Sequence, residues 1–395
     1  MKKTLVLLLV LAMVFSLAAC AKDTTEPATE AVETETDAEP ATETEAEDMM
    51  PASDIPLIAF CSDVGTIDDE SFNQYSYAGV VSVCEAYGIE YEYFVPAEDS
   101  TEQRQTNIRQ AVSDGAACIV VTGYLYGEAL AWAAAEYPDV NFIGIDVSEY
   151  DIVSYADAIP ANVRSIVYHE EQAGYLAGYA AVKDGYTELG FLGGMAVPAV
   201  VRYGYGYVQG ADAAAAEMGT DININYYYGG QFYGDASITA KMEGWYSNGT
   251  EIVFACGGGI YTSAVEAALN YDGKVIGVDV DQNYLGLNGV ADGTYAYNPF
   301  VTSAYKSLQT SVEDVLNEFV EGNWIGGVSS NLGLAEGDYV GLPTGADSWN
   351  FATFTVDDYN TVVEGIRDGS ITVDPSSDTT TTPAVSDFTT VNYIS

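Results

Sequence analysis

A polar loop at residues 63–73 carries the side chains best suited to bind a ligand. It contains Asp63, Ser71, Phe72 and Asn73. A carboxylate and an amide exchange hydrogen bonds with polar groups, and a phenyl ring offers a flat apolar face to a heterocycle. The alternative is that Asp63 and Ser71 only satisfy the backbone of the loop and that Phe72 belongs to the core.

The elements on either side of this loop must position it. Residues 55–61 form an apolar run that predicts a strand, and small and apolar residues recur at helical spacing over residues 74–87. Ser71 is placed to cap that helix. In an open α/β sheet, the loop after the carboxyl end of a strand faces the ligand crevice. We therefore expect residues 63–73 to line a binding cleft.

Other predicted strands end in residues of similar chemistry. Asp146 and Asp279 each close an apolar run, and residues 257–259 are three glycines that follow another run. Carboxylates accept hydrogen bonds from hydroxyl groups, and glycine lets the backbone approach a ligand closely. Taken singly, each acid is equally compatible with an Asx turn or a helix cap. Together with Asp63 they predict a cleft that holds vicinal hydroxyl groups.

The sequence lacks the common motifs of catalysis and phosphate binding. No Lys-Ser/Thr pair follows the triple glycine, no G-x-S-x-G occurs, and His169 is the single histidine. The acid pairs Asp68 with Asp69 and Asp279 with Asp281 could serve a glycosidase, but neighbouring loop acids are usually solvated. The cysteines after Cys20 stand in apolar settings without a C-x-x-C pair, so we expect buried free thiols. We expect no enzyme, no metal and no cofactor.

Strands and helices alternate along the body of the chain. Strands are expected at residues 89–95, 118–122, 141–146, 188–193, 222–228, 251–256 and 275–279. Helices are expected at residues 102–113, 128–136, 169–182, 204–218, 237–246, 262–270 and 359–368. This alternation predicts an α/β fold with doubly wound, mostly parallel sheets.

A break in the pattern at residues 151–162 divides the body into two expected lobes that face a cleft. Lobe 1 is expected to comprise residues 56–158, completed by about 283–325. Lobe 2 is expected to comprise residues 159–282, completed by about 326–375. Residues 376–395 are rich in Thr and Ser, and we expect a loose C-terminal tail.

The N-terminus carries a targeting signal. Lys2 and Lys3 precede an apolar run, and residues 17–20 read Leu-Ala-Ala-Cys, which matches a bacterial lipobox. We expect residues 1–19 to be a signal peptide cleaved before Cys20, which would carry the lipid, palmitate included. An ordinary signal peptide or a short membrane anchor is the alternative. Residues 20–55 would form a disordered acidic tether, with the body on the extracytoplasmic face of the cell membrane.

The chain is strongly acidic. It has 59 acidic and 12 basic residues, which give a formal net charge of -47. Such a charge repels nucleic acid and anionic lipid surfaces. We therefore expect no nucleic-acid partner, and free nucleotides are disfavoured as ligands for the same reason.

Several stretches resemble motifs of one protein family. Residues 63–74 read Asp-Val-Gly-x-Ile-Asp-Asp-x-Ser-Phe-Asn-Gln, and residues 275–282 read Val-Ile-Gly-Val-Asp-x-Asp-Gln. Weaker agreement occurs at residues 137–146, 191–198, 204–213 and 302–306. Over about residues 55–373 the chain resembles the basic membrane protein family of lipoproteins, which includes purine-nucleoside receptors that serve ABC importers. The resemblance implies a type I periplasmic-binding-protein fold, in which two lobes close on a nucleoside.

The resemblance also implies which residues contact the ligand. Phe72 and Asn73 would stack on the base and read its edge, and an aromatic residue of the other lobe would complete the sandwich. Phe232 is the best match for that residue, with Tyr228 and Tyr233 as alternatives. The other implied positions are Asp63 and Asp146 in lobe 1, with Gly259, Asp279 and Lys306 on the ribose side.

The expected function is therefore the capture of nucleosides, with purines favoured, for an ABC importer whose permease and ATPase subunits are the partners. A binding protein for a sugar or a furanose signalling molecule is the alternative, because it would share the strand-end acids without needing both aromatic rings. An enzyme on the same scaffold is the third hypothesis. Thr66 stands where the family usually has glycine, and the family's basic character is absent, so base preference and the transporter contact surface stay open.

Overall fold

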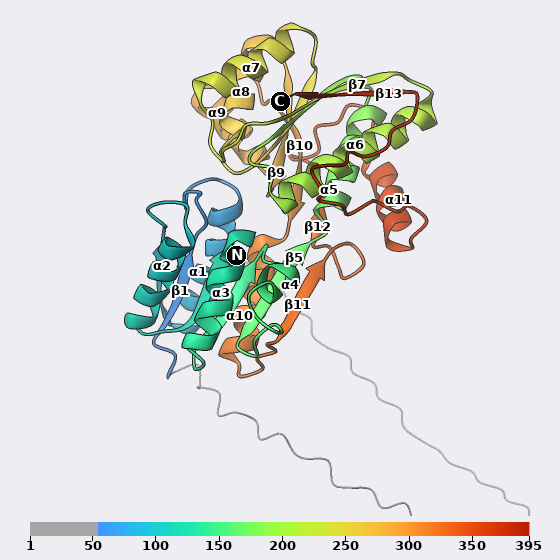
Figure 1. Ribbon diagram of the computed structural model, residues 1–395. Coiled ribbons are helices and arrows are strands. Elements are labelled where there is room, and N and C mark those ends of the chain that lie inside the picture. Colours follow the sequence, from blue (N-terminus) through green and yellow to red (C-terminus); the bar gives the residue numbers. More distant parts are fainter. Residues whose placement is uncertain (1–53, 395) are drawn as a thin grey trace, which may run out of the picture. The chain divides into compact units, whose positions relative to one another are not determined.

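The computed structural model describes residues 54–394 (Figure 1). The expected signal peptide, the expected lipidation site Cys20 and nearly all of the expected tether lie outside these residues. Within the described part, no helix combines the length and the apolar character that a membrane span requires. The strands form two sheets, each covered by helices.

The first sheet has six parallel strands in the order β11-β5-β4-β3-β1-β2. Their bounds are Leu57–Cys61 (β1), Glu90–Phe94 (β2), Ala116–Thr122 (β3), Asn141–Ile145 (β4), Val163–Tyr168 (β5) and Val328–Leu332 (β11). Its helices are Phe72–Tyr87 (α1), Thr101–Ser113 (α2), Gly127–Glu136 (α3), Glu149–Val153 (α4) and Leu308–Val320 (α10), with a 3₁₀ turn at Tyr124–Tyr126 (η2). Strand β1 is entirely buried, because its alternate side chains enter two separate cores on opposite faces of the sheet.

The second sheet has seven strands in the order β12-β10-β9-β8-β6-β7-β13, all parallel except β12. Their bounds are Glu188–Gly193 (β6), Ile222–Tyr228 (β7), Ile252–Cys256 (β8), Lys274–Asp279 (β9), Phe300–Lys306 (β10), Val340–Gly341 (β12) and Thr389–Ile394 (β13). Its helices are Glu170–Lys183 (α5), Pro198–Met218 (α6), Ala236–Ser247 (α7), Tyr261–Tyr271 (α8), Asn283–Asp292 (α9) and Val356–Arg367 (α11). We call the first sheet with its helices lobe 1 and the second lobe 2.

The predicted alternation of strands and helices is confirmed, but the predicted lobe boundaries are wrong at three strands. Residues 163–168 (β5) and 328–332 (β11) fall in the range expected for lobe 2 but join the first sheet, whereas residues 300–306 (β10) fall in the range expected for lobe 1 but join the second. None of the three was among the predicted strands. Between the described strands, the chain changes lobe after Tyr168, after Lys306 and after Leu332. The composition of a strand shows that it is buried in a sheet, but it does not show which of two sheets it joins.

The expected loose tail is also corrected. Within residues 376–395, Thr389–Ile394 form β13, which pairs with β7 along its whole length. Without β13, strand β7 would be an edge with unpaired backbone groups, and the Thr, Val and Tyr residues of β13 favour extended structure. The Thr- and Ser-rich composition therefore includes a real strand.

Glycines allow α5 and α6 to pack in close contact. A Cβ atom on Gly174 would lie 2.1 Å from the carbonyl oxygen of Tyr203, and one on Gly210 would lie 1.9 Å from that of Tyr175. Only glycine tolerates so close an approach. Helix α6 begins at Pro198, earlier than its predicted start at residue 204, since proline suits the first turn of a helix. That added turn carries residues of the candidate site.

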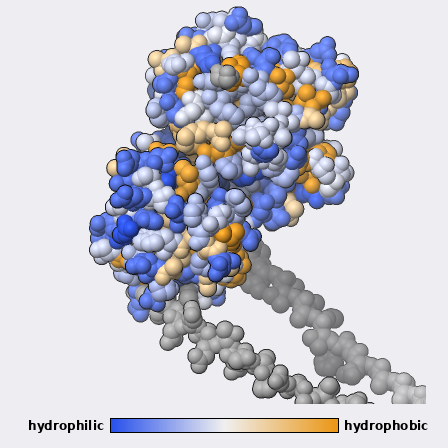
Figure 2. Space-filling view, in the orientation of Figure 1, coloured by the Kyte–Doolittle hydropathy of each residue, from blue (hydrophilic) through white to orange (hydrophobic). Residues whose placement is uncertain are grey.

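One face of the molecule is mostly hydrophilic. On the face shown in Figure 2, hydrophilic residues dominate and hydrophobic residues occur singly or in small groups. Isolated apolar residues are normal on soluble surfaces. The face therefore gives no reason to place a ligand outside the cavity described next.

Candidate ligand-binding site

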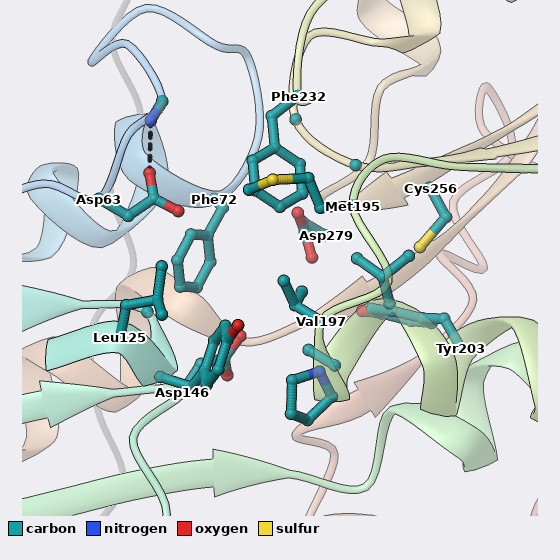
Figure 3. Close-up of a pocket in the computed structure, with 18 of the residues that line it drawn as sticks. Asp63, Phe72, Leu125, Asp146, Met195, Val197, Tyr203, Phe232, Cys256 and Asp279 are labelled. Atoms are coloured by element: carbon teal, nitrogen blue, oxygen red, sulfur yellow. Dashed lines mark hydrogen bonds between the residues drawn. The ribbon is translucent and has the colours of Figure 1, made fainter. Parts of the chain in front are cut away.

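A cavity of about 530 Å³ is lined by residues of both lobes (Figure 3). Its volume lies within the range of about 300–1,000 Å³ that is usual for small-molecule sites. The structure brings together at this cavity the following predicted residues: Asp63, Phe72, Asn73, Asp146, Phe232, Asp279 and Lys306. Apolar side chains of both lobes complete the wall, among them Leu125, Met195 and Val197.

Asp63 follows β1 and is held in place by its own loop. Its Oδ1 accepts hydrogen bonds from the backbone N–H of Gly65, at 2.6 Å, and from Nδ2 of Asn73, at 2.9 Å. Burial raises the pKa of Asp63, against the effect of these two donors. Oδ1 of Asp63 therefore satisfies donors of its own loop, as expected if the residue only stabilises the loop. Asp63 nevertheless also lines the cavity.

The amide of Asn73 is occupied by protein groups. Its Nδ2 donates to Asp63 and, at 3.2 Å, to Asp69, and its Oδ1 accepts from Thr122 Oγ1 at 2.9 Å. The side chain therefore fixes the position of Asp63. Direct reading of a ligand by Asn73 would require it to exchange one of these bonds, so that role stays a prediction.

Ser71 stands at the N-cap position of helix α1, as predicted, but the capping hydrogen bonds are made by the side chain of Asp69. The Asp69 carboxylate accepts from the backbone N–H groups of Ser71, Asn73 and Gln74. Burial raises the pKa of Asp69 to about 6, although these donors favour its charged form. The Ser71 side chain makes no capping bond and instead donates to Asp279 Oδ2 of lobe 2 at 2.6 Å. The loop thus links the lobes directly.

Two strand-end acids have left-handed backbone conformations. Asp146, after β4, has φ 57°, and Asp279, at the end of β9, has φ 65°. A non-glycine residue in this region is uncommon, and strain of about 1–3 kcal/mol of this kind concentrates at functional sites. Both carboxyl groups lie at the cavity, so the strain places them where a ligand would meet them.

Lys306, at the end of β10, is buried among three carboxylates. Its Nζ lies 2.5 Å from Asp146 Oδ2, 3.4 Å from Glu170 Oε1 and 3.7 Å from Asp279 Oδ1. Burial alone would lower the pKa of Lys306, but the three acids raise it well above its ordinary value. The lysine is therefore charged at neutral pH and joins acids from both lobes.

The charged group continues into α5 and α6. Arg202 Nε donates to Glu170 Oε2 at 2.6 Å. Burial would raise the pKa of Glu170, but Arg202 and Lys306 outweigh it and hold that pKa below its ordinary value. For Asp146, burial outweighs Lys306 and raises the pKa to about 6. We call Asp146, Glu170, Arg202, Asp279 and Lys306 the charged cluster.

The two predicted phenyl rings reach the cavity from different lobes. Phe72 begins α1, and Phe232 lies in the loop after β7; both side chains project into the cavity in Figure 3. Lys306 Nζ lies 4.7 Å from the centre of the Phe72 ring. Of the alternatives to Phe232, Tyr233 is 63% exposed and Tyr228 packs against Tyr226, and neither lines the cavity.

The glycine loop contributes through different residues from the one predicted. Gly257 and Gly258 line the cavity, whereas Gly259 lines a neighbouring one and pairs with Tyr233. Gly257 and Gly258 both have positive φ, and a Cβ atom on Gly257 would lie 2.8 Å from the backbone of Gly194. Gly259, the predicted ligand contact, does not line this cavity, because the turn at the strand end directs its first two glycines there instead.

Two polar atoms at the cavity have no partner among the described residues. They are Asp146 Oδ1 and the hydroxyl oxygen of Tyr203, both buried. A buried polar atom without a partner costs about 1–3 kcal/mol. A ligand that accepts a hydrogen bond from Tyr203 and donates one to Asp146 would remove that cost.

Comparison with known proteins decides the family. Residues 57–366 match the family model described as ABC transporter substrate-binding protein PnrA-like, or Bmp. The chain belongs to this family. The "ABC transporter nucleoside-binding protein BmpA" of Lactococcus lactis is 30% identical over 329 residues, which are 80% of this chain and 88% of that protein. "Basic membrane protein A1" of Borrelia garinii is 32% identical over 292 residues, 72% of this chain and 79% of that protein.

Solved structures support the fold of this Bmp-family protein. A solute-binding protein from Aeropyrum pernix has a TM-score of 0.68 at 21% identity and covers 82% of this chain and 95% of its own. One from Conexibacter woesei has a TM-score of 0.61 at 20% identity and covers 81% of this chain and 99% of its own. The fold is therefore the predicted type I periplasmic-binding-protein fold, and the family is one of binding proteins rather than enzymes.

Sequence reasoning missed Glu170, Arg202 and Tyr203 at the site of this Bmp-family protein. One signal was available, since the chain has only 12 basic residues and Arg202 interrupts an apolar stretch. The predicted buried thiols are confirmed, since Cys61, Cys84, Cys118 and Cys256 are free and buried. Within residues 54–394, no group of three or more His, Cys, Asp or Glu side chains is arranged to hold a metal ion.

Proposed function

We propose that this substrate-binding protein captures nucleosides in its interlobe cavity and presents them to the permease and ATPase subunits of an ABC importer. The observation that carries the proposal is the pairing of two phenyl rings, Phe72 and Phe232, with the charged cluster around Lys306 in one cavity. A nucleoside joins a flat heterocycle to a polyhydroxyl sugar, so its two halves match the two kinds of wall. The name of the Lactococcus lactis relative, a nucleoside-binding protein, agrees with this.

The aromatic side would bind the base. A stacked aromatic pair contributes about 0.5–1.5 kcal/mol beyond the burial of apolar area. Phe72 and Phe232 come from different lobes, so a base between them would also hold the lobes together. Purine is the preferred base in this proposal, because the larger ring system covers more of both faces.

The charged side would bind the ribose. Hydrogen bonds from hydroxyl groups to carboxylates contribute about 1.5–3 kcal/mol each. Two groups there have no hydrogen-bond partner among the described residues: the acceptor Asp146 Oδ1 and the hydroxyl group of Tyr203. Asp279 and Lys306 lie beside them, and Gly257 and Gly258 let the backbone approach the sugar.

Nucleotides would be rejected by the same groups. Asp63, Asp146 and Asp279 all line the cavity, and their carboxylates would face a phosphate group. Lys306 is already paired with the last two of them. A phosphate would therefore add unpaired negative charge to a buried site, which is strongly unfavourable.

Membrane attachment completes the proposal. Cys20 within the lipobox would be acylated after removal of residues 1–19, and the acidic tether would hold the body at the extracytoplasmic face of the cell membrane. Mass spectrometry of the mature N-terminus tests this. An unmodified Cys20 within an uncleaved chain would contradict it.

A sugar receptor is the second candidate function. The charged cluster alone offers what a furanose needs, and the ion pairs of Lys306 do not involve Phe232. In that case Phe72 and Phe232 would only pack against the ring faces of the sugar. Binding of free ribose without binding of any nucleoside would favour this candidate.

Isothermal calorimetry with a ligand panel tests the proposed function. The panel is adenosine, guanosine, inosine, cytidine, uridine, ribose and adenosine monophosphate. We expect heat from nucleosides, most strongly from purine nucleosides, and none from ribose or the monophosphate. Equal affinity for the monophosphate would overturn the proposed role of the carboxylates, and conversion of a nucleoside during incubation would identify an enzyme.

A further inference from the structure

The C-terminal segment, residues 374–394, is fastened to helix α6, and we call this segment the strap. The Gln209 side chain donates to the carbonyl oxygen of Asp374 at 3.1 Å and accepts from its backbone N–H at 2.8 Å. The Tyr205 hydroxyl donates to the carbonyl oxygens of Asp378 and Thr381 at 3.2 and 2.7 Å. These side chains lie on one face of α6, since they are four residues apart in the helix.

The strap runs along α6 and then turns back. Asp374 lies at Gln209, and Asp378 lies at Tyr205, one turn nearer to the start of the helix. Ser386 then bonds Asp212, farther along the helix, through its backbone N–H and its hydroxyl, at 2.9 and 2.7 Å. The turn of the strap, residues 377–381, is therefore its closest approach to the first residues of α6. Those residues line the ligand cavity.

The far end of the strap is fixed in the second sheet. Strand β13 pairs with β7 in parallel register, from Thr389 opposite Ile222 to Ile394 opposite Tyr227. The ring centre of Tyr393 lies 5.1 Å from that of Tyr226. Figure 1 shows the segment, in dark red, passing along α6 and ending beside β7. The turn at residues 377–381 is thus fixed at both ends, by Gln209 before it and by the pairing of β13 with β7 after it.

One residue of this turn reaches the cavity itself. Ser377 lines the same cavity as Phe72, Asp146 and Lys306. It is half-buried, whereas Thr379, in the same turn, is exposed and does not line the cavity. The strap also lies outside residues 57–366, the part that matches the family. This wall of the site therefore lies outside the residues that match the family model.

We propose that the strap is a specificity element of this chain, in which Ser377 contacts the bound nucleoside and the fixed turn limits its size and slows its exit. The inference rests on the proposed function for the identity of the ligand. The strap carries Asp374, Asp378 and Asp387 and no basic residue, so it favours a neutral ligand over a phosphorylated one. A nucleoside that fits the cavity must not extend past Ser377, which lines its wall.

Two tryptophan variants of the full chain test the contact. Ser377→Trp places a large ring at the cavity wall, and Thr379→Trp places the same ring on the exposed side of the same turn. Calorimetry with adenosine should show an affinity reduced by about tenfold or more for Ser377→Trp and unchanged for Thr379→Trp. Unchanged affinity in Ser377→Trp would overturn the proposal, as would equal losses in the two variants.

A ligand-free measurement separates this proposal from the proposed function. In a Cys20→Ser background, the remaining native thiols are buried, so Ser377→Cys and Thr379→Cys each introduce one accessible thiol. Maleimide should react about tenfold more slowly at position 377 than at position 379, and adenosine should protect position 377 alone. If wild type binds no nucleoside, the proposed function fails. Equal maleimide reaction rates at positions 377 and 379 without ligand would contradict the claim that Ser377 lines the cavity.

Discussion

The aromatic side and the charged side of the cavity differ in how their side chains are held. Phe72 and Phe232 present rings to the cavity, and Phe232 comes from an irregular loop. Asp146, Asp279 and Lys306 stand at strand ends and are tied to one another by ion pairs. The charged side is therefore pre-organised by ion pairs, whereas the two rings are held by packing against the core and, for Phe72, by contact with Lys306. Selectivity among bases should depend on the rings, and recognition of the sugar on the charged side.

Removing the central cation should have the largest effect. Lys306→Met leaves buried carboxylates without their shared partner, so we expect a loss of about 3–5 kcal/mol in the free energy of unfolding, together with loss of nucleoside binding. Urea denaturation measures the first and calorimetry the second. Lys241→Met is the control, because Lys241 only lies over the ring of Tyr227, a contact worth about 0.5–1 kcal/mol. Equal losses in the two variants would show that the charged cluster is not pre-organised.

Removing one ring should abolish selectivity while sparing the fold. Phe232→Ala loses stacking and apolar burial of about 2–4 kcal/mol in total, so adenosine affinity should fall by about 30- to 1,000-fold. Phe232 is the cleaner choice because Phe72 also contacts Lys306. Tyr233→Ala, at the exposed neighbour, should leave affinity unchanged. If Phe232→Ala binds adenosine as wild type does, the base does not lie between the rings.

Removing the hydroxyl group of Tyr203 tests whether a ligand bonds to it on the charged side of the cavity. Tyr203→Phe should reduce nucleoside affinity by about tenfold, the value of one hydrogen bond, without lowering the melting temperature, since that hydroxyl has no protein partner. Tyr207→Phe is a matched control, because its hydroxyl is equally buried and unpartnered on the same helix but does not line the cavity. A reduced affinity in both variants would indicate a packing effect.

The smallest effect concerns pH. Burial raises the pKa of Asp146 to about 6 in the free protein. A ligand that donates a hydroxyl hydrogen to Asp146 favours the ionised form, so binding should release protons near pH 6 and affinity should fall as the pH drops below about 6. Free-protein stability has the opposite sign for this group. Since the raised pKa lets the folded state keep protons that the unfolded state loses, its contribution grows as the pH falls from about 6 to about 4.

Calorimetry in two buffers of different ionisation enthalpy measures the released protons. The release should disappear in Asp146→Asn. Release that persists in that variant would point to Asp69 instead, whose pKa burial also raises to about 6. Affinity that rises below pH 6 would contradict the assignment of Asp146 as a hydrogen-bond acceptor.

The strand ends of the site could be predicted from the sequence, but its helical residues could not. Asp63 and Asp146 follow strands of the first sheet, and Asp279 ends a strand of the second. In a parallel α/β sheet the carboxyl ends of the strands face the ligand crevice, so these acids could be expected at the cavity. Tyr203 lies on α6, where buried residues occupy most of the helix surface, so no polar stripe shows which face meets the ligand. Glu170 could not be predicted for the same reason, since most residues of α5 are buried and the helix has no polar face that would indicate the site.

The lobe boundaries and the strap escaped prediction for another physical reason. The sheet that β10 and β11 join is determined by long-range pairing, which the local sequence pattern does not record. Ser377 lies in a Thr- and Ser-rich stretch whose order comes from side chains of α6 such as Tyr205 and Gln209. Composition alone gives such a stretch no reason to be ordered.

A crystal structure of the protein grown with adenosine tests the central claim most directly. We predict electron density for the base between the rings of Phe72 and Phe232, with the ribose hydroxyls on Asp146 and beside Lys306. Density that places the sugar between the rings and the base against the charged cluster would contradict the account, as would a ligand bound outside this cavity.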